Sequence, residues 1–194
     1  MNIFARNAGL ILKTFLYQIV MSLFGFMMYG ATYKIPFLLV IGQITVVLFY
    51  FYILTTQMYQ GGAKQSEYDL SHKEKSSALA GFLFALIAFL PTFVFAIISV
   101  CSQPFTAEGA TNTAGYLCYL GNHTFLQGMY VGITQHIFPT VSGGANDALN
   151  FANMASINAR CFLHLFGAVP GILASAISYF VGYRSFRKEK KEKK

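Results

Sequence analysis

The sequence carries little charge for its length. Only 11% of its 194 residues are Asp, Glu, Lys or Arg, and seven are acidic. Soluble domains contain about 25% charged residues. Here hydrophobic residues make up 55% of the chain and the mean hydropathy is +0.51. This balance excludes an ordinary soluble domain and predicts one membrane-embedded domain.

Tryptophan is absent and cysteine is scarce. Without Trp, aromatic anchoring at the membrane interfaces must come mainly from the 12 Tyr residues. The three cysteines are Cys101, Cys118 and Cys161, and no CxxC pair occurs among them. That spacing disfavours a redox or zinc motif and leaves open whether two of them form a disulfide.

Long apolar runs dominate what is present. A helix needs about 20 mostly apolar residues to cross the hydrocarbon core, because each residue adds about 1.5 Å. The sequence therefore predicts an all-α, polytopic membrane protein with a four-helix transmembrane bundle. Four runs meet the length requirement, at residues 8–30, 35–59, 78–101 and 161–183.

Positive charge is concentrated at the C-terminus. The net charge is +7, but seven of the fourteen Lys and Arg residues lie in the tail, residues 184–194. A short basic tail beside a membrane span is expected to contact anionic lipid headgroups. We therefore expect the lipid bilayer as a partner and no nucleic acid.

The distribution of basic residues also predicts orientation. The N-terminus, the linker at residues 60–77 and the tail together hold twelve Lys and Arg residues, whereas only Lys34 and Arg160 lie on the opposite side. Basic residues accumulate on the cytoplasmic side of membrane proteins. Both termini are therefore predicted to be cytoplasmic, and the protein is expected in the plasma membrane.

The outer segment, residues 102–160, is the least regular part. Its middle is moderately apolar, but glycines and polar residues around Asn122 interrupt it. A fifth span there would place the basic tail outside. We therefore predict short interfacial or re-entrant helices that return to the same side, at about residues 114–120 and 124–138.

Small residues line one face of the fourth predicted span. Spacing of this kind lets another helix backbone approach closely. The neighbour can be a helix of the same bundle, a second copy or a partner protein. The residues are Gly167, Gly171, Ser175 and Gly182.

Polar residues also occur deep within the first two predicted spans, notably Gln18, Gln43 and Thr45. Such side chains commonly form ordinary hydrogen bonds between helices. Their alternative role is to line a polar cavity for a solute. No carboxylate accompanies them inside the spans, which disfavours ion-coupled transport.

The outer side also collects residues capable of chemistry. His123, His136, Cys161 and His164 form a candidate cluster there, and Cys161 and His164 share one helix face at i and i+3. No HExxH or closely spaced His pair supports a metal site. We therefore expect no metal, no cofactor and no catalytic residue.

These observations lead to three hypotheses on function. The first is a non-enzymatic subunit or accessory protein of a membrane complex or homo-oligomer. The alternative is a small-solute transporter or substrate-binding membrane subunit. The third is a membrane enzyme that uses the outer-side histidines.

Overall fold

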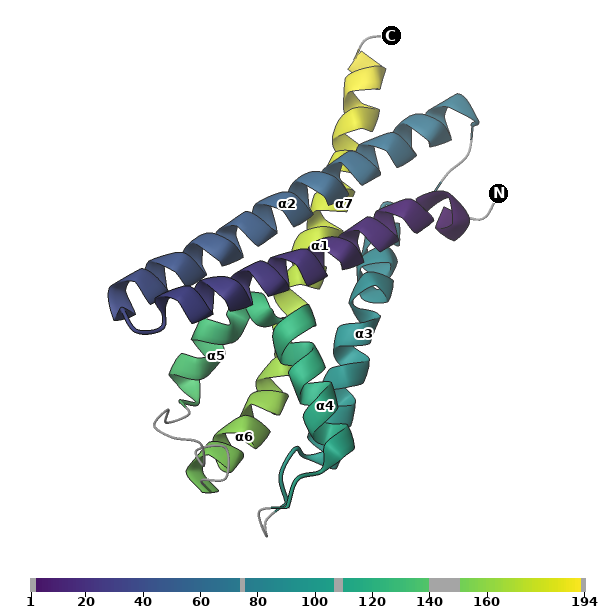
Figure 1. Ribbon diagram of the computed structural model, residues 1–194. Helices are drawn as coiled ribbons and strands as arrows, with labels where there is room; N and C mark the ends of the chain where they lie inside the picture. Colours follow the sequence, from purple (N-terminus) through teal and green to yellow (C-terminus); the bar gives the residue numbers. More distant parts are fainter. Residues whose placement is uncertain (1–2, 74–75, 107–109, 140–150, 193–194) are drawn as a thin grey trace. The chain divides into compact units, whose positions relative to one another are not determined.

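The structure, a computed structural model, consists almost entirely of helices (Figure 1). The described part of the chain contains no β-strand beyond one isolated bridge between Phe105 and Thr111. The fold is therefore all-α, as predicted. The described residues are 3–73, 76–106, 110–139 and 151–192.

Within the described part of the chain, four helical stretches are long and apolar enough to cross a membrane. They are α1 (Ile3–Thr32), α2 (Pro36–Ser71), α3 (Ala80–Ser102) and a stretch formed by α6 and α7. Their number agrees with the prediction. The chain is an integral membrane protein.

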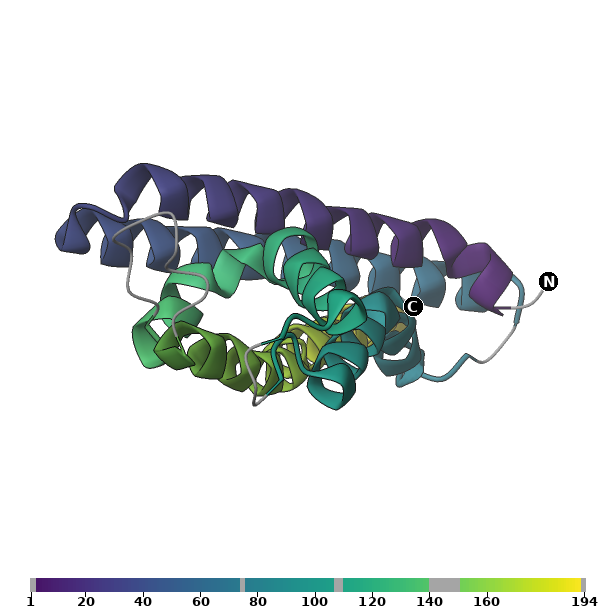
Figure 2. The same ribbon diagram turned by 60° about the horizontal axis from the view of Figure 1, so that its bottom comes forward.

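The first two helices form an antiparallel pair and lie side by side in both views (Figures 1 and 2). The Ile35 amide donates a hydrogen bond of 2.9 Å to the carbonyl of Thr32, and Pro36 then begins α2. Proline is favoured at the first helical position, where its missing N–H costs nothing. The short connection between the first two predicted spans therefore forms a tight hairpin.

The second helix is longer than its apolar run. Its 36 residues give a length of about 54 Å, against a hydrocarbon thickness of about 30 Å. Helix α2 continues through Gly61 and Gly62, where the sequence predicts a linker. An added Cβ at Gly62 would collide with the backbone of Tyr179, so this glycine permits close helix packing rather than a turn.

The outer segment contains a chain of short helices. They are α4 (Thr113–Gly121), the π-helix η1 (Asn122–Leu126), the 3₁₀ turn η2 (Gly128–Tyr130) and α5 (Val131–Ile137). The Asn112 side chain caps α4 by accepting a 3.2 Å hydrogen bond from the Gly115 amide. Short helices were predicted here, but the interruption lies at Gln127 rather than near Gly121.

The last stretch is also interrupted. Helix α6 (Phe151–Gly167) ends one residue before α7 (Val169–Glu192) begins. Pro170 lacks the N–H that a continuous helix would require there. The turn-rich run at residues 140–146 also predicts a helix N-cap at Asn146 or Asp147, and these residues lie outside the described part.

The chain divides into two compact units. Unit 1 comprises Met1–Tyr17, Phe49–Leu90 and Val169–Lys194, and unit 2 comprises Gln18–Leu48 and Pro91–Ala168. Unit 1 has an aromatic and aliphatic core with fully buried side chains such as Leu54, Phe84 and Tyr179. Unit 2 buries Val46, Met129 and Val131 together with an unusual number of polar side chains. The candidate site lies among those polar residues.

Candidate functional site

Six buried polar side chains of unit 2 form what we call the polar centre. None exposes more than 8% of its surface. Burying so many polar groups costs free energy unless they are hydrogen-bonded, so the hydrogen-bond partners of these side chains decide whether the arrangement is stable. The residues are Gln18, Thr92, Asn122, His123, Gln127 and His164.

Two amides of the polar centre connect three segments of the chain. The Gln18 amide donates to the Thr92 hydroxyl at 2.6 Å and to the Leu126 carbonyl at 3.0 Å. The Asn122 amide donates to the Thr92 carbonyl at 3.2 Å. Helix α1 is thereby tied to η1 through the Leu126 carbonyl, and η1 is tied to α3 through the Thr92 carbonyl.

Two helix interruptions meet at Gln127. Its backbone, at φ −133° and ψ 16°, separates η1 from η2. Its side-chain amide donates 2.6 Å to the carbonyl of His164, near the end of α6. A Cβ at Gly167 would collide with the same amide. The absence of a side chain at Gly167 thus lets the interrupted segment pack against the interrupted helix.

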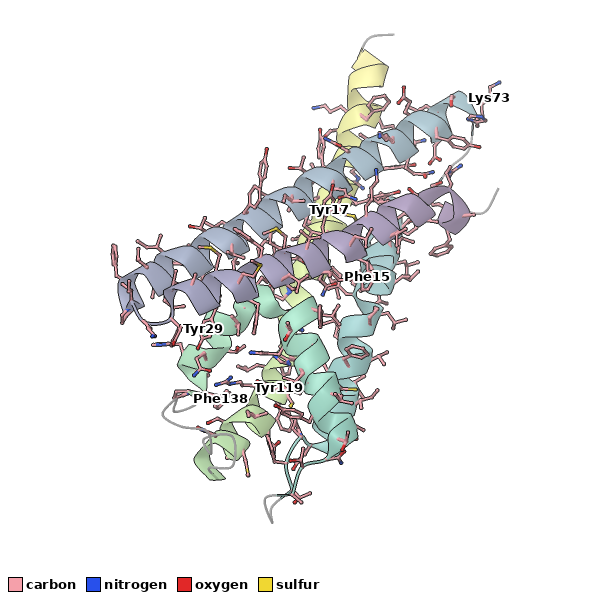
Figure 3. All side chains as sticks on the ribbon, in the orientation of Figure 1. Phe15, Tyr17, Tyr29, Lys73, Tyr119 and Phe138 are labelled. Atoms are coloured by element: carbon pink, nitrogen blue, oxygen red, sulfur yellow. The ribbon has the colours of Figure 1, made fainter. Side chains whose placement is uncertain are left out.

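The two buried histidines face each other. His123 Nδ1 and His164 Nε2 are 3.4 Å apart, and the Tyr119 ring stacks on both, with centroid distances of 5.1 and 5.5 Å. Tyr119 is labelled in Figure 3. The sequence places both histidines in one candidate cluster, and the fold brings them together across 41 positions.

Several polar atoms of unit 2 have no hydrogen-bond partner among the described residues. Three are obligatory or potential acceptors, namely Gln18 Oε1, Asn122 Oδ1 and His164 Nδ1. The hydroxyl groups of Ser22 and Tyr130 likewise have no hydrogen-bond partner among the described residues. Native proteins pair most such groups with protein or ordered water, so these five atoms are the hydrogen-bonding groups of unit 2 that are left for water or a polar ligand.

The Arg160 cation lies in this unit without a carboxylate partner among the described residues. The buried Arg160 side chain donates to the Phe138 carbonyl, with its Nε at 2.9 Å, and to the amide oxygen of Gln135. The described part of unit 2 contains no Asp or Glu. The charged side chains among the described residues of unit 2 are therefore all basic.

The structure separates the residues predicted to line a polar cavity. Gln43 is buried, donates 3.3 Å to the Gly25 carbonyl and accepts 3.1 Å from the Gly132 amide. Thr45 is exposed and only donates back to the Ile41 carbonyl of its own helix. Gln18 belongs to the polar centre, Gln43 holds α5 against α2, and Thr45 faces outward.

The predicted outer cluster is also divided. His136 lies apart from the histidine pair, in an apolar groove of about 310 Å³ that Gln43 and Gly132 also line. Cys161 is buried, and its thiol donates 3.4 Å to the Ile157 carbonyl. All three cysteines are free thiols. No group of three potential metal ligands occurs among the described residues.

Neighbours within the chain occupy the small-residue face. A Cβ at Gly171 would collide with the Phe89 ring, and one at Gly182 with the Tyr59 backbone. Ser175 is fully buried, and Gly167 packs on Gln127. These residues therefore serve close packing inside each unit.

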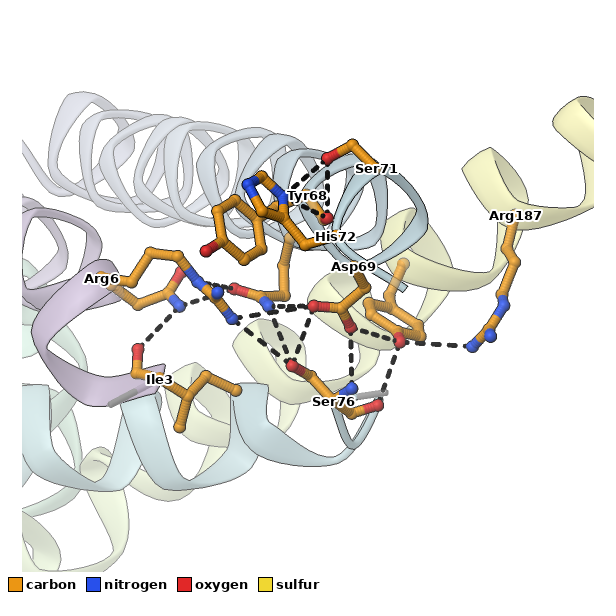
Figure 4. A network of polar contacts seen from close by, with 11 residues as sticks. Ile3, Arg6, Tyr68, Asp69, Ser71, His72, Ser76 and Arg187 are labelled. Atoms are coloured by element: carbon orange, nitrogen blue, oxygen red, sulfur yellow. Dashed lines mark hydrogen bonds and ion pairs between the residues drawn. The ribbon is translucent and has the colours of Figure 1, made fainter. Parts of the chain in front are cut away.

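Unit 1 contains a separate polar network (Figure 4). Its centre is Asp69, which accepts hydrogen bonds of 2.8 Å from the Tyr183 hydroxyl and the Ser76 amide and 2.7 Å from the Gln65 amide. Arg6 lies 3.7 Å from the carboxylate and stacks over the Tyr68 ring at 3.8 Å. The network fastens the end of α2 to α1 and α7.

Asp69 lies in the polar end of α2, beyond the predicted span at residues 35–59. Burial on its own raises the pKa of its carboxyl group. The hydrogen bonds from Ser76, Tyr183 and Gln65 favour the carboxylate and outweigh burial, so the pKa lies below the ordinary 3.8. Asp69 is therefore a charged anchor at neutral pH.

A groove of about 610 Å³ also lies in unit 1, between the N-terminal part of α1 and the C-terminal part of α2. Three cations line it, Arg6, Lys13 and Lys64, and no acidic residue is among its lining residues. Its amide lining includes Gln57 and Gln60. No local sequence pattern indicates this groove, because it forms only where two separate helices pack together.

The chain matches no known family model, no curated protein and no solved structure. Its function therefore has to be inferred from the geometry above.

Proposed function

We propose that this protein binds a small, uncharged polar solute at the polar centre and allows it to cross the membrane. The observation that carries the proposal is the set of unpartnered buried polar atoms in unit 2, together with the two helix interruptions that the Gln127 side chain joins. This favours the transport alternative over an accessory subunit, because the small-residue face that suggested a partner is filled from within the chain.

Helix interruptions at membrane depth have a restricted set of explanations. Hydrocarbon cannot satisfy free backbone groups, so irregular backbone persists only where protein surrounds it or where it lines a polar cavity. Interrupted helices form the substrate sites of many transporters. π-Helical turns such as η1 are likewise frequent at functional sites.

The chemistry of the polar centre supports an uncharged solute with several N–H or O–H donors. Gln18 Oε1, Asn122 Oδ1 and His164 Nδ1 offer acceptors, while the Ser22 and Tyr130 hydroxyls can donate or accept. No carboxylate is present among the described residues of unit 2 to bind a cation. Polyols, sugars and amides have the required groups.

The proposed orientation places both termini in the cytoplasm and the protein in the plasma membrane as a multi-pass protein. Twelve of the fourteen Lys and Arg residues then lie inside and two outside. The positive-inside rule supports this arrangement.

Thermal unfolding of the purified protein in detergent tests the binding step. The panel contains uncharged polyols, sugars and amides, with amino acids and metal cations for comparison. A ligand at 100 times its Kd stabilises a protein by about 2.7 kcal/mol, which raises the unfolding temperature by several degrees. We expect at least one uncharged compound to do so.

Two variants make the test specific. Gln18→Leu removes the amide of the polar centre at similar volume, and loss of one solute hydrogen bond weakens binding about tenfold. Thr45→Val is the matched control, because Thr45 faces outward. A flat panel, or equal stabilisation of wild type and Gln18→Leu, would contradict the proposal.

A further inference from the structure

We propose that the groove of unit 1 between α1 and α2 binds the headgroup of an anionic phospholipid, with the start of an acyl chain along its apolar end. This site is independent of the polar centre and of the basic tail. The groove's charge, its gradient of polarity and its open side all point to such a lipid.

Helical spacing directs the cations into the groove. On α1, Arg6, Leu10, Lys13 and Tyr17 recur at intervals of three and four and so share one face. On α2, Gln57, Gln60 and Lys64 likewise recur at intervals of three and four and share one face.

The register of the two helices is set by three contacts. The Asn7 amide donates 2.8 Å to Gln65, a Cβ at Gly61 would meet Leu10, and the Thr14 hydroxyl lies 3.6 Å from the Met58 sulfur. Lys13 and Lys64 therefore flank the middle of the groove.

The positive charge in the groove is only partly neutralised. Arg6 lies 3.7 Å from Asp69, so its guanidinium is held in place and shares its charge with that carboxylate. Lys13 and Lys64 are exposed, and neither has an ion-pair partner among the described residues. Two ammonium groups are thus available to a phosphate, together with neutral amide donors.

Gln57 adds a polar group without a partner. Its amide nitrogen and oxygen are both shielded from solvent and make no hydrogen bond within the described part of the chain. The residue lines the groove. Rotation of this amide toward the groove would let it bond to phosphate oxygens or hydroxyls of a headgroup.

The groove changes character along its length. Toward the ends of the helices its lining is charged, whereas toward the apolar part of the helices it is formed by Tyr17, Tyr52 and Ile53. The two tyrosines are 38% and 66% exposed, so this end is open to the side. A charged end joined to an apolar, laterally open end matches an amphipathic lipid and not a free anion.

Binding of fluorescent short-chain phosphatidylglycerol to the delipidated full-length protein in neutral detergent tests the proposal. Anisotropy is expected to give saturable binding, at least tenfold tighter than for phosphatidylcholine with the same chains. Inorganic phosphate at millimolar concentration is expected not to displace the lipid. Equal affinity for both lipids, or displacement by phosphate, would overturn the proposal.

Two kinds of variant locate the site. Lys13→Gln with Lys64→Gln is expected to weaken binding about thirtyfold, since each basic residue contributes about a factor of five near an anionic surface. Lys34→Gln with Lys73→Gln removes the same charge elsewhere and is expected to leave the Kd unchanged. If both double variants weakened phosphatidylglycerol binding equally, binding would rest on general charge attraction, and the proposed site would be overturned.

A steric variant keeps the charge and fills the groove. A side chain added at Gly9 meets open space, and Gly9 lines the groove. Gly9→Phe is therefore expected to fold normally and to weaken phosphatidylglycerol binding at least tenfold. Unchanged binding by folded Gly9→Phe would place the lipid elsewhere.

Discussion

At the scale of single residues, the Asp69 network and the polar centre use buried polarity differently. The carboxylate of Asp69 receives hydrogen bonds from Ser76, Tyr183 and Gln65, so its charge is compensated. The polar centre of unit 2 leaves Gln18 Oε1 and Asn122 Oδ1 without partners in the described part. The first arrangement suits a structural anchor, and the second suits a binding site.

Replacement of the anchoring carboxylate by a neutral amide, Asp69→Asn, is expected to destabilise the protein by about 2 kcal/mol at neutral pH. The variant loses the charge that Arg6 faces and the charge-assisted hydrogen bonds from its neighbours. Because the pKa of Asp69 is lowered in the folded state, this contribution is complete above about pH 3.8 and is lost as the pH falls through the folded-state pKa.

Thermal unfolding of wild type and Asp69→Asn between pH 7 and pH 3 measures that dependence. The difference in unfolding temperature should shrink toward the acid end. A difference that stays constant over the whole range would show that the charge of Asp69 contributes nothing to stability.

At the scale of elements, glycines decide which segments approach each other. A Cβ at Gly128 would collide with the Ser22 carbonyl, and one at Gly25 with the Met129 backbone. These contacts press η2 against α1 within unit 2. Backbone atoms cannot yield as a flexible side chain can, so the two positions require glycine.

Gly128→Ala is therefore expected to cost about 3 kcal/mol, the upper end of the range for overpacking. Gly9→Ala is the matched control, because its methyl group meets open space and alanine favours a helix. The control should be unchanged or up to about 1 kcal/mol more stable. Denaturant titration in mixed micelles compares the two, and equal stability of Gly128→Ala and wild type would refute the packing of η2.

The number of long helices could be predicted from the sequence because composition and length determine that property. The outward position of Thr45 could not, since the part of α2 around it is mostly apolar on all sides and its hydrophobic pattern indicates no inward face. The hydrogen-bond partners of Gln18 and Gln43 could not be predicted from the sequence either. Leu126 and Gly132 contribute backbone groups, whose positions depend on packing between distant segments.

The interruption at Gln127 could be predicted only in part. Polar and glycine residues do break the apolar stretch of the outer segment, but the predicted break near Gly121 is wrong. Gly121 continues the helix, because α4 passes directly into the π-helical turn η1. The side chains of Gln18 and Gln127 then fix the break six residues later, through contacts that no local pattern reveals.

At the scale of the whole molecule, the proposed orientation can be checked with protease. Trypsin added to sealed, inverted membrane vesicles should remove the Lys-rich tail at residues 184–194, because that tail is proposed to face the cytoplasm. Trypsin added to intact spheroplasts should leave it in place until detergent is added. Mass spectrometry of the recovered protein detects tail removal in both cases. Removal of the tail from intact spheroplasts would show that the orientation is opposite to the one proposed.

The central claim is that a solute crosses the membrane through the polar centre. Solute flux into proteoliposomes, for the compound that most stabilises the protein, tests it most directly. Wild-type protein and Thr45→Val should give faster uptake than protein-free liposomes, and Gln18→Leu should reduce uptake at least tenfold. Uptake no faster than in protein-free liposomes, or equal uptake by wild type and Gln18→Leu, would contradict the claim.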